Sequence, residues 1–351
     1  MQHKESTISP RTSHIRLASL LFGTVTCAGF GMYMRCTLTA AVVCTGLMVN
    51  VVNAEDRSQD LKQKTIGMLA GEAEWLPLVQ DVAKTLNHHD GLRILPIAGE
   101  GSIQAVSDLM HINGVDVALI PADSVAYAKA QGLVPPDGER IAYLARIGSI
   151  KVLLITKTET QSLTDLAGKR IATGPAQSSG FATGELVLGA LGLPFTRVPM
   201  DGAGAIAALE RGDADAALVL GTQNLAVLKS AANYKILPLP LPKDIEGIYA
   251  PSILADAEIE RYGIKSAPID TIATPLVLAV YNWSSKNPHS DVFYTFNKAI
   301  LGAANLPESD AQWIKNNLAA DVPSLVRHVS AKRALEESAP TAAAGEQGVT
   351  Q

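Results

Sequence analysis

The chain has 351 residues, of which 47% are hydrophobic and 18% are charged, and its formal net charge is −5. This length allows two domains with cores of their own, and this composition excludes a wholly disordered chain. The excess of acidic over basic residues argues against nucleic acid as a partner.

The first 54 residues are expected to be a leader, which contains four basic residues and one acidic residue. The segment 34–54 fits a secretory signal peptide, because Arg35 precedes an apolar run and small side chains precede Glu55. This interpretation makes residues 1–31 an upstream extension before the true start, and it places the mature protein in the periplasm. Removal of the leader leaves a net charge of −8.

The earlier apolar run, Leu17–Met34, allows an alternative. Its length of about 18 residues is the lower limit for a transmembrane helix. Cys27, Cys36 and Cys44 all lie in the leader, so the chain after it contains no cysteine. Disulfides, thiolate nucleophiles and cysteine metal sites are thereby excluded from the mature protein.

Strand and helix patterns alternate from residue 64 onward with short loops between them, which is typical of a parallel α/β sheet. Apolar or β-branched runs predict the strands, and apolar residues at helical spacing predict the helices. The run 141–156 is expected as two strands broken near Gly148-Ser149. Before it, the pattern predicts strands at 65–69, 92–97 and 115–120, and helices at 75–86, 102–112 and 124–130.

A second unit of the same kind is expected from residue 157. It opens with a short capped helix that ends at Gly168. The segment 251–262 has no clear pattern, Pro323 should break or kink the last helix, and residues 338–351 should form a flexible tail. The predicted strands are 170–173, 196–199, 216–220, 235–239 and 274–281, and the predicted helices are 179–191, 203–211, 222–232, 292–304 and 313–329.

Insertion of this second unit into the first requires two crossings, which we expect near 155–160 and 271–276. The expected fold is a two-lobed α/β protein in which each lobe is a mostly parallel sheet flanked by helices. Residues 64–156 and 275–335 would form a discontinuous lobe 1, and residues 157–274 would form lobe 2. A ligand cleft is expected between the lobes, at the carboxyl ends of the strands.

Two loops of small residues lead into helices in a way that favours anion binding. Ser178, Ser179 and Gly180 open one helix, and Gly101 and Ser102 open another. The first N–H groups of a helix lack intrahelical partners and lie at the positive end of its dipole. We therefore expect these two helix starts to hold a ligand carboxylate from both lobes. A capping role alone is the alternative for each.

Further candidates lie near the ends of the predicted strands. Asp123 follows one buried strand, and Gly221 and Thr222 follow another. Lining of the cleft and capping of a helix are the two alternative roles for these residues. Arg146 would neutralise a ligand carboxylate, and so would Lys151, unless each is a solvated charge at a strand edge.

The first strand–helix loop contains Gly71, Glu72 and Trp75. Trp75 would form an apolar floor for a ligand, or pack beneath the loop instead. Glu72 would pair with an amino group and repel a bare dicarboxylate.

Patterns that would indicate catalysis or cofactor binding are incomplete. Gly202–Ala207 loosely matches a dinucleotide loop, but no acidic residue follows about 20 positions later. Ser178 lacks the Gly-x-Ser-x-Gly frame of a nucleophile elbow. The histidines have no metal-ligand spacing. We therefore expect no catalytic residue, no metal and no cofactor.

Four segments together carry a resemblance to a known family, namely 67–83, 98–128, 165–193 and 201–222. The chain resembles the TAXI class of solute receptors, which serve TRAP transporters and share the type II periplasmic-binding-protein fold. The match covers roughly 64–305. The first loop is poorer in glycine and tyrosine than is usual in that class, and the segment around Arg146 lacks its aromatic and acidic residues. The resemblance therefore implies a receptor role but not a particular ligand.

The sequence thus leads to the hypothesis of a monomeric periplasmic receptor for a small organic anion, either a carboxylate or an amino acid. The receptor would deliver this ligand to the permease subunits of a TRAP-type transporter. Two alternatives stay open. One is an enzyme on the same fold, such as a transferase or a pyrimidine-processing enzyme, and the other is a ligand sensor for a membrane kinase.

Overall fold

The computed structural model describes residues 65–87, 89–135, 139–228, 231–264, 267–303, 313 and 316–338. The chain divides into two compact units, Met1–Glu55 and Asp56–Gln351, and every described residue belongs to the second. The expected signal peptide, the alternative membrane span at 17–34 and the tail beyond Ser338 lie outside the described residues. None of the helices in the described part combines the length and apolar character that a membrane crossing requires.

The first strand group contains three parallel strands, β1 (Thr65–Ala70), β2 (Arg93–Ala98) and β3 (Val117–Pro121), with β1 in the middle. The helices that follow these strands are α2 (Leu76–Leu86), α3 (Ser102–His111) and α4 (Ala122–Ala130). The sequence prediction of these elements is confirmed to within a few residues at each end.

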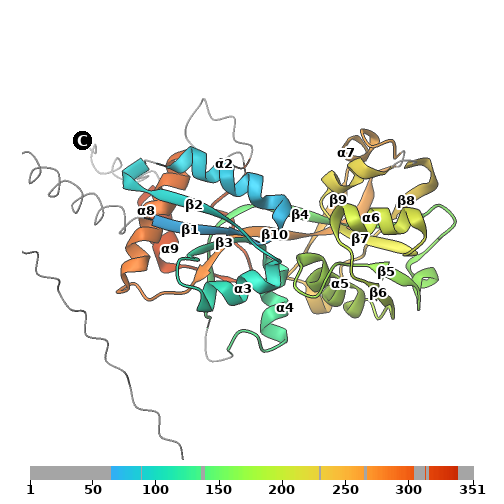
Figure 1. Cartoon of the computed structure of the whole chain (residues 1–351), viewed down its shortest axis with the longest axis horizontal. Coiled ribbons are helices and arrows are strands. Elements are labelled where there is room, and N and C mark those ends of the chain that lie inside the picture. The colour runs from blue at the N-terminus through green and yellow to red at the C-terminus, as the bar shows by residue number, and fades with distance from the viewer. Residues whose placement is uncertain are drawn as a thin grey trace, which may run out of the picture. The chain divides into compact units, whose positions relative to one another are not determined.

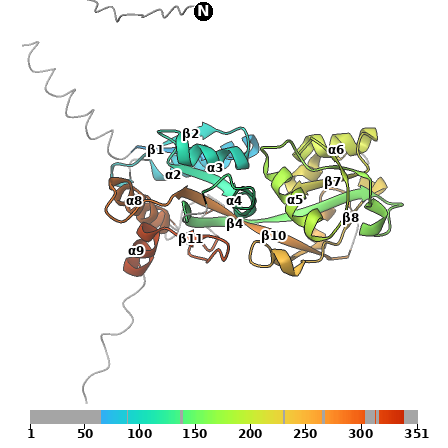
Figure 2. The same cartoon turned by 90° about the horizontal axis from the view of Figure 1, so that it is seen from below.

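Two long strands continue from this group to a second group of strands (Figures 1 and 2). The strand β10 (Ile269–Tyr281) lies between β3 and β4 (Ile141–Lys157) and is antiparallel to both. Beyond Val152, β4 pairs instead with the strands β7 and β8. The complete sheet therefore has antiparallel strands at its centre and parallel strands on both sides.

The break predicted near Gly148-Ser149 is wrong, because β4 is one continuous strand. The irregularity takes the form of a bulge. Leu276 pairs with Gly148, whereas the next residue, Val277, pairs with Arg146. One extra residue is thus accommodated without ending the strand, as β-bulges allow.

The second strand group contains the parallel strands β5 (Arg170–Ala172), β6 (Thr196–Val198) and β7 (Ala216–Leu220), with β5 in the middle. Its helices are α5 (Ser179–Ala190) and α6 (Gly202–Arg211). The helix predicted at 222–232 is replaced by a shorter 3₁₀ helix, Thr222–Val227. The structure then adds β8 (Tyr234–Leu237), β9 (Ala250–Leu254) and α7 (Asp256–Glu260), the last two in the segment without a clear sequence pattern.

The C-terminal region returns to the first strand group. The helix α8 (Pro288–Ala303) is followed by β11 (Val326–Arg327), which pairs with β4, and by α9 (Val329–Ser338). The helix predicted at 313–329 is wrong over 317–327, where the chain forms turns and β11. Pro323 disfavours a helix here, since it lacks an N–H group and restricts the residue before it.

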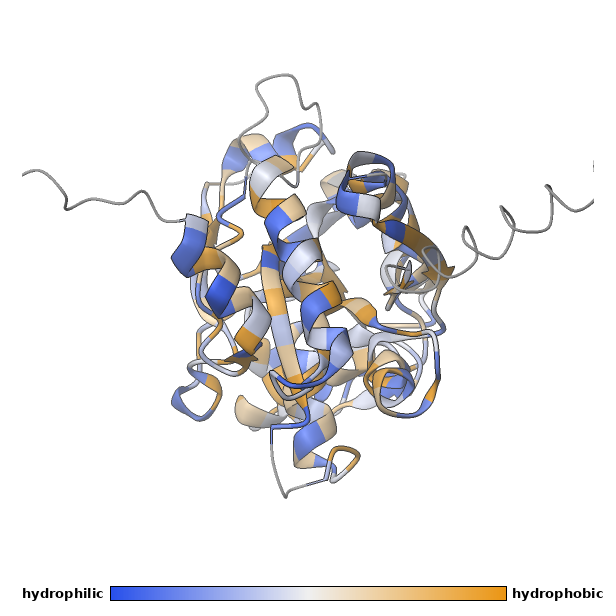
Figure 3. Ribbon diagram, turned by 90° about the vertical axis from the view of Figure 1, so that its left-hand side faces the viewer, coloured by the Kyte–Doolittle hydropathy of each residue, from blue (hydrophilic) through white to orange (hydrophobic). Residues whose placement is uncertain are grey.

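The apolar pattern of the elements explains how they pack. The helix α2 buries Val79, Val82 and Leu86 at helical spacing, and the helices in Figure 3 show hydrophobic positions alternating with hydrophilic ones. On β4, Leu154 belongs to one buried cluster and Leu153 to another. Successive residues of this strand thus fill cores on opposite faces of the sheet.

Candidate functional site

The loop after β1 brings a carboxylate to the start of α3. At Gly71, a Cβ atom would lie 2.6 Å from Ile120 Cγ2 and 2.7 Å from Ser102 Oγ, so only glycine allows this close approach. The next residue, Glu72, is partly buried and is directed toward Ser102. Trp75 is buried in the core beneath the loop, with 7% of its surface exposed, which matches the packing alternative for this residue.

The Glu72 carboxylate accepts hydrogen bonds from both predicted anion-binding helix starts. Its Oε1 atom lies 3.1 Å from Ser102 N, 3.0 Å from Ser102 Oγ and 2.6 Å from Ser179 N. The donors that we expected to hold a ligand carboxylate are therefore bonded to a carboxylate of the chain itself. Burial raises the pKa of Glu72, and the hydrogen bonds from Ser179 and Ser102 oppose this rise.

The two strand groups meet around this carboxylate. Ile103 N donates to Gln177 O at 3.0 Å, and a Cβ atom on Gly101 would lie 2.2 Å from that oxygen. Ser178 caps α5, because its Oγ accepts from Phe181 N at 3.2 Å and donates to Pro175 O at 2.9 Å. For Ser178 the structure thus shows the capping alternative.

Gly180 lies in the first turn of α5 and lines the cavity described below. A Cβ atom there would lie 2.6 Å from Thr173 O. The absence of a side chain therefore lets α5 pack against the end of β5.

Asp123 links the groups at a second place. It is fully buried in α4, and its Oδ2 atom accepts from Thr183 Oγ1 at 2.6 Å and from Tyr249 OH at 2.7 Å. Burial raises the pKa of Asp123, while the hydrogen bond from Thr183 and then that from Tyr249 lower it. Asp123 therefore contacts the second strand group and is absent from the described lining of the cavity.

Neither partner of Asp123 was predicted from the sequence. Thr183 was detectable in principle, since it lies four residues after Ser179 and so on the same face of α5. Tyr249 precedes β9 in a segment without a clear local pattern.

A cavity of about 430 Å³ lies beside Glu72 and Ser179. Its wall combines residues of the first group, from the loops after β1 and β2, with residues of the second group around the starts of α5 and α6. The apolar part of the wall is Leu218–Leu220, and Asn224 adds an amide whose Nδ2 donates to Leu220 O at 2.8 Å. Asn224 is a cavity residue that the sequence did not predict.

Among the described residues that line the cavity, every ionisable side chain is acidic. These side chains are Glu72, Glu74, Glu100 and Asp201. Loss of surrounding water, and then the negative charges of Glu72 and Asp201, raises the pKa of Glu74 to about 7. Loss of water also raises the pKa of Asp201. No group of three or more His, Cys, Asp or Glu residues in the described ranges is arranged to hold a metal ion.

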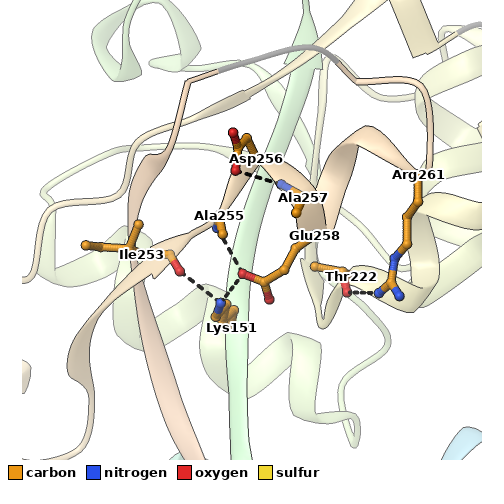
Figure 4. Close-up of polar contacts among 8 residues, drawn as sticks. All are labelled: Lys151, Thr222, Ile253, Ala255, Asp256, Ala257, Glu258 and Arg261. Carbon is orange, nitrogen blue, oxygen red and sulfur yellow. Dashed lines mark hydrogen bonds and ion pairs between the residues drawn. The ribbon is translucent and has the colours of Figure 1, made fainter.

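The remaining sequence candidates are absent from the described lining of this cavity. Arg146 is bonded on its own strand, since Nε donates to Gly148 O at 3.3 Å and its NH2 group donates to Ser149 Oγ. Gly221 N donates to Lys151 O at 2.9 Å. Thr222 Oγ1 accepts from Arg261 at 3.3 Å (Figure 4).

Lys151, the other candidate cation, also forms its contacts away from the described lining of the cavity. Its Nζ atom lies 2.5 Å from Glu258 Oε2 and donates to Ile253 O at 2.8 Å (Figure 4). Neither Arg146 nor Lys151 therefore offsets the negative charge of the cavity wall by direct contact.

Comparisons with known proteins give one family and several distant structures. Among solved structures, XAC2383 from Xanthomonas citri bound to chloride ion is 14% identical, with a TM-score of 0.47, over 78% of this chain and 95% of that one. The alkanesulfonate-binding protein SsuA from Xanthomonas axonopodis pv. citri bound to MOPS is 15% identical, with a TM-score of 0.41, over 74% of this chain and 84% of that one. A putative L-cystine ABC transporter from Listeria monocytogenes is 14% identical, with a TM-score of 0.44, over 74% of this chain and 98% of that one.

No curated protein matches the sequence. The family model that matches is that of the NMT1-like family, and it covers residues 71–338, well over half of the chain. This range includes Glu72, both helix starts and the whole described lining of the cavity. The chain therefore has an α/β fold, with a mixed sheet flanked by helices, and it belongs to the NMT1-like family.

Proposed function

We propose that this protein is a periplasmic receptor that binds a small amine-bearing cation in the cavity beside Glu72 and delivers it to a membrane transporter. The resemblance to TAXI receptors supports a TRAP-type permease as the transporter. The ligand class differs from the anion expected from the sequence. An amino acid that presents its ammonium group to the acidic wall stays within the proposal, whereas a simple carboxylate does not.

The observation that carries this proposal is the charge of the cavity wall. Four acidic side chains line it, and no lysine, arginine or histidine occurs among its described lining residues. Two unit charges about 4 Å apart interact by about 4 kcal/mol near a protein surface, and the sign decides between attraction and repulsion. A carboxylate ligand would add a like charge to this wall, whereas an ammonium group would offset it.

The position of the cavity supports a receptor role. Glu72 and Glu74 come from the loop after β1, whereas Asp201 and Gly202 come from the start of α6 in the second strand group. A ligand that contacts both groups favours the arrangement in which they are together, because its affinity differs between that arrangement and an open one. A transporter can then recognise the loaded receptor by its conformation.

A matched ligand screen tests the proposal. Thermal unfolding of the purified protein is followed with amines (butylamine, putrescine, choline and lysine) and with carboxylates of similar size (butyrate and succinate). An amine at 100 times its dissociation constant should stabilise the protein by about 2.7 kcal/mol. Stabilisation by the carboxylates alone, or chemical turnover of a bound compound, would contradict the proposal.

A further inference from the structure

We infer that Glu72 is the specificity-determining residue of this site, because its carboxylate fills a binding seat that would otherwise accept the carboxylate of a ligand. The seat consists of Ser102 N, Ser102 Oγ and Ser179 N. The inference deepens the proposed function and rests on it for the role of the cavity. The seat itself stands on the hydrogen bonds around Glu72.

The geometry of the seat is that of a carboxylate site. A single oxygen, Glu72 Oε1, accepts all three bonds, at 2.6–3.1 Å. Two of the donors are backbone N–H groups at the first residues of α3 and α5, which are 10 and 12 residues long. N–H groups at helix starts bind negative charge because they lack intrahelical partners and lie at the positive end of the dipole. Here the Glu72 carboxylate already accepts hydrogen bonds from these groups, so its position marks where a ligand carboxylate would bind.

The donors come from both strand groups. Ser102 belongs to the first group and Ser179 to the second, 77 positions further along the chain. Glu72 therefore bridges the groups as a ligand carboxylate would. Because it is part of the chain, it competes with free carboxylates at the high effective concentration of an intramolecular group.

Glu72 also lines the cavity, so its side chain contributes to the negative charge of the cavity wall. Its presence therefore has two effects on a ligand carboxylate: it occupies the donors and it adds a negative charge beside them. Removal of Glu72 should reverse both effects and open the seat to an external carboxylate.

Chemical rescue tests the inference. The variant Glu72→Ala is made in the full chain, and thermal unfolding is measured in sodium acetate and in sodium chloride of equal ionic strength. Without acetate, E72A should unfold at a lower temperature than the wild type, because donors at two buried helix starts lose their acceptor. At 100 mM, acetate should raise the unfolding temperature of E72A by about 3 °C or more relative to chloride. The wild type should respond equally to both salts.

Two matched variants control the experiment. Glu100→Ala removes an acid of the same cavity wall to which the structure assigns no hydrogen bond with a described residue, and it should not respond to acetate. Glu72→Gln keeps an oxygen acceptor in the seat without the charge, so it should fold and should not respond to acetate either. An acetate effect of equal size in E100A, or none in E72A, would overturn the inference.

Loss of folding in E72A does not prevent the test. If E72A is unfolded in chloride, acetate should restore the folded state, and failure to do so counts against the seat. The outcome is also separable from the ligand class. Acetate rescue without amine binding would support the seat and contradict the amine proposal. Amine binding without acetate rescue would support the amine proposal and contradict the seat.

Discussion

At the scale of single residues, the main feature is a set of acids held close together in one cavity. At Glu72, three hydrogen bonds to the carboxylate oppose the rise in pKa that burial causes. Glu74 has no such support among the described hydrogen bonds, and its pKa is raised to about 7. A group that titrates near neutral pH next to a binding site makes binding depend on pH.

We expect the affinity for a cation to fall as the pH falls through 7. Glu74 is neutral below this pH and negative above it, and only the negative form attracts a cation. With choline, whose charge does not change with pH, the dissociation constant from isothermal titration calorimetry should rise by up to about tenfold per pH unit below 7. In Glu74→Gln this dependence should be lost, and a wild-type pH profile in that variant would show that another group is responsible.

The residues of the site differ in how far the sequence could predict them. The starts of α3 and α5 at Ser102 and Ser179 follow from local pattern, since small residues after a strand favour a helix start. The occupant of those starts could not be predicted in this way. Glu72 is 30 positions from Ser102 and 107 from Ser179, and a contact over such a separation leaves no local signal.

At the scale of elements, the contact between the two strand groups is made by helix starts and loops with little free space. Gly101 lies at the N-cap of α3, and the backbone of Gln177, in the loop before α5, occupies the position that a Cβ atom would take. The hydrogen bond from Ile103 N to Gln177 O depends on this approach. One methyl group at position 101 is therefore enough to disturb the contact.

The variant Gly101→Ala should separate the starts of α3 and α5. Hydrogen–deuterium exchange is expected to be faster at Ile103 N and Ser179 N, since both N–H groups would lose their acceptors. Gly189→Ala in α5 is the matched control, because no atom lies within 4 Å of the added Cβ apart from the neighbouring residues and the nearby backbone of the helix itself. That control should stabilise the helix by about 0.5–1 kcal/mol. Unchanged exchange in G101A would show that the groups tolerate the methyl group.

At the scale of the whole molecule, the described carboxyl groups with a shifted pKa form two sets with opposite effects on stability. The pKa is raised, mainly by burial, for Glu72, Glu74, Asp123 and Asp201. For Asp165, Asp215 and Glu337 the pKa is lowered by hydrogen bonds. For Glu258 the largest influence is burial, which raises the pKa, but the hydrogen bond from Lys151 and other contacts outweigh it. The first set holds protons more strongly in the folded state than in the unfolded state, and the second set holds them less strongly.

The free energy of unfolding should therefore be greatest near the unfolded pKa values of these groups, at about pH 4 to 5, and should decline as the pH rises toward 7. The unfolded pKa values are 3.8 for aspartate and 4.5 for glutamate. Above them, the groups of the first set hold more protons in the folded protein than in the unfolded chain, so stability falls as the pH rises. Below those values, stability from the second set is lost as the pH falls through their folded pKa values. Urea unfolding across this range gives the curve, and a steady rise in stability from pH 5 to 8 would contradict it.

The fold was predictable where it depends on local repetition and was not where it depends on distant pairing. The alternation of strands and helices in both groups follows from apolar periodicity. Pattern also identified most of β10, but its place between β3 and β4 depends on residues far apart in the sequence. The strand β9 is mostly exposed, so its sequence carries little apolar signal.

The position of β10 has a consequence for the order in which the chain is synthesised. The centre of the sheet consists of a strand that the ribosome makes after every strand of both parallel groups. Until that strand emerges, β3 and β4 have no partner along their facing edges, whereas β5, β6 and β7 already have each other. The growing chain therefore cannot complete its sheet until near the end of translation, which delays final folding and prolongs the time during which a chaperone can bind it.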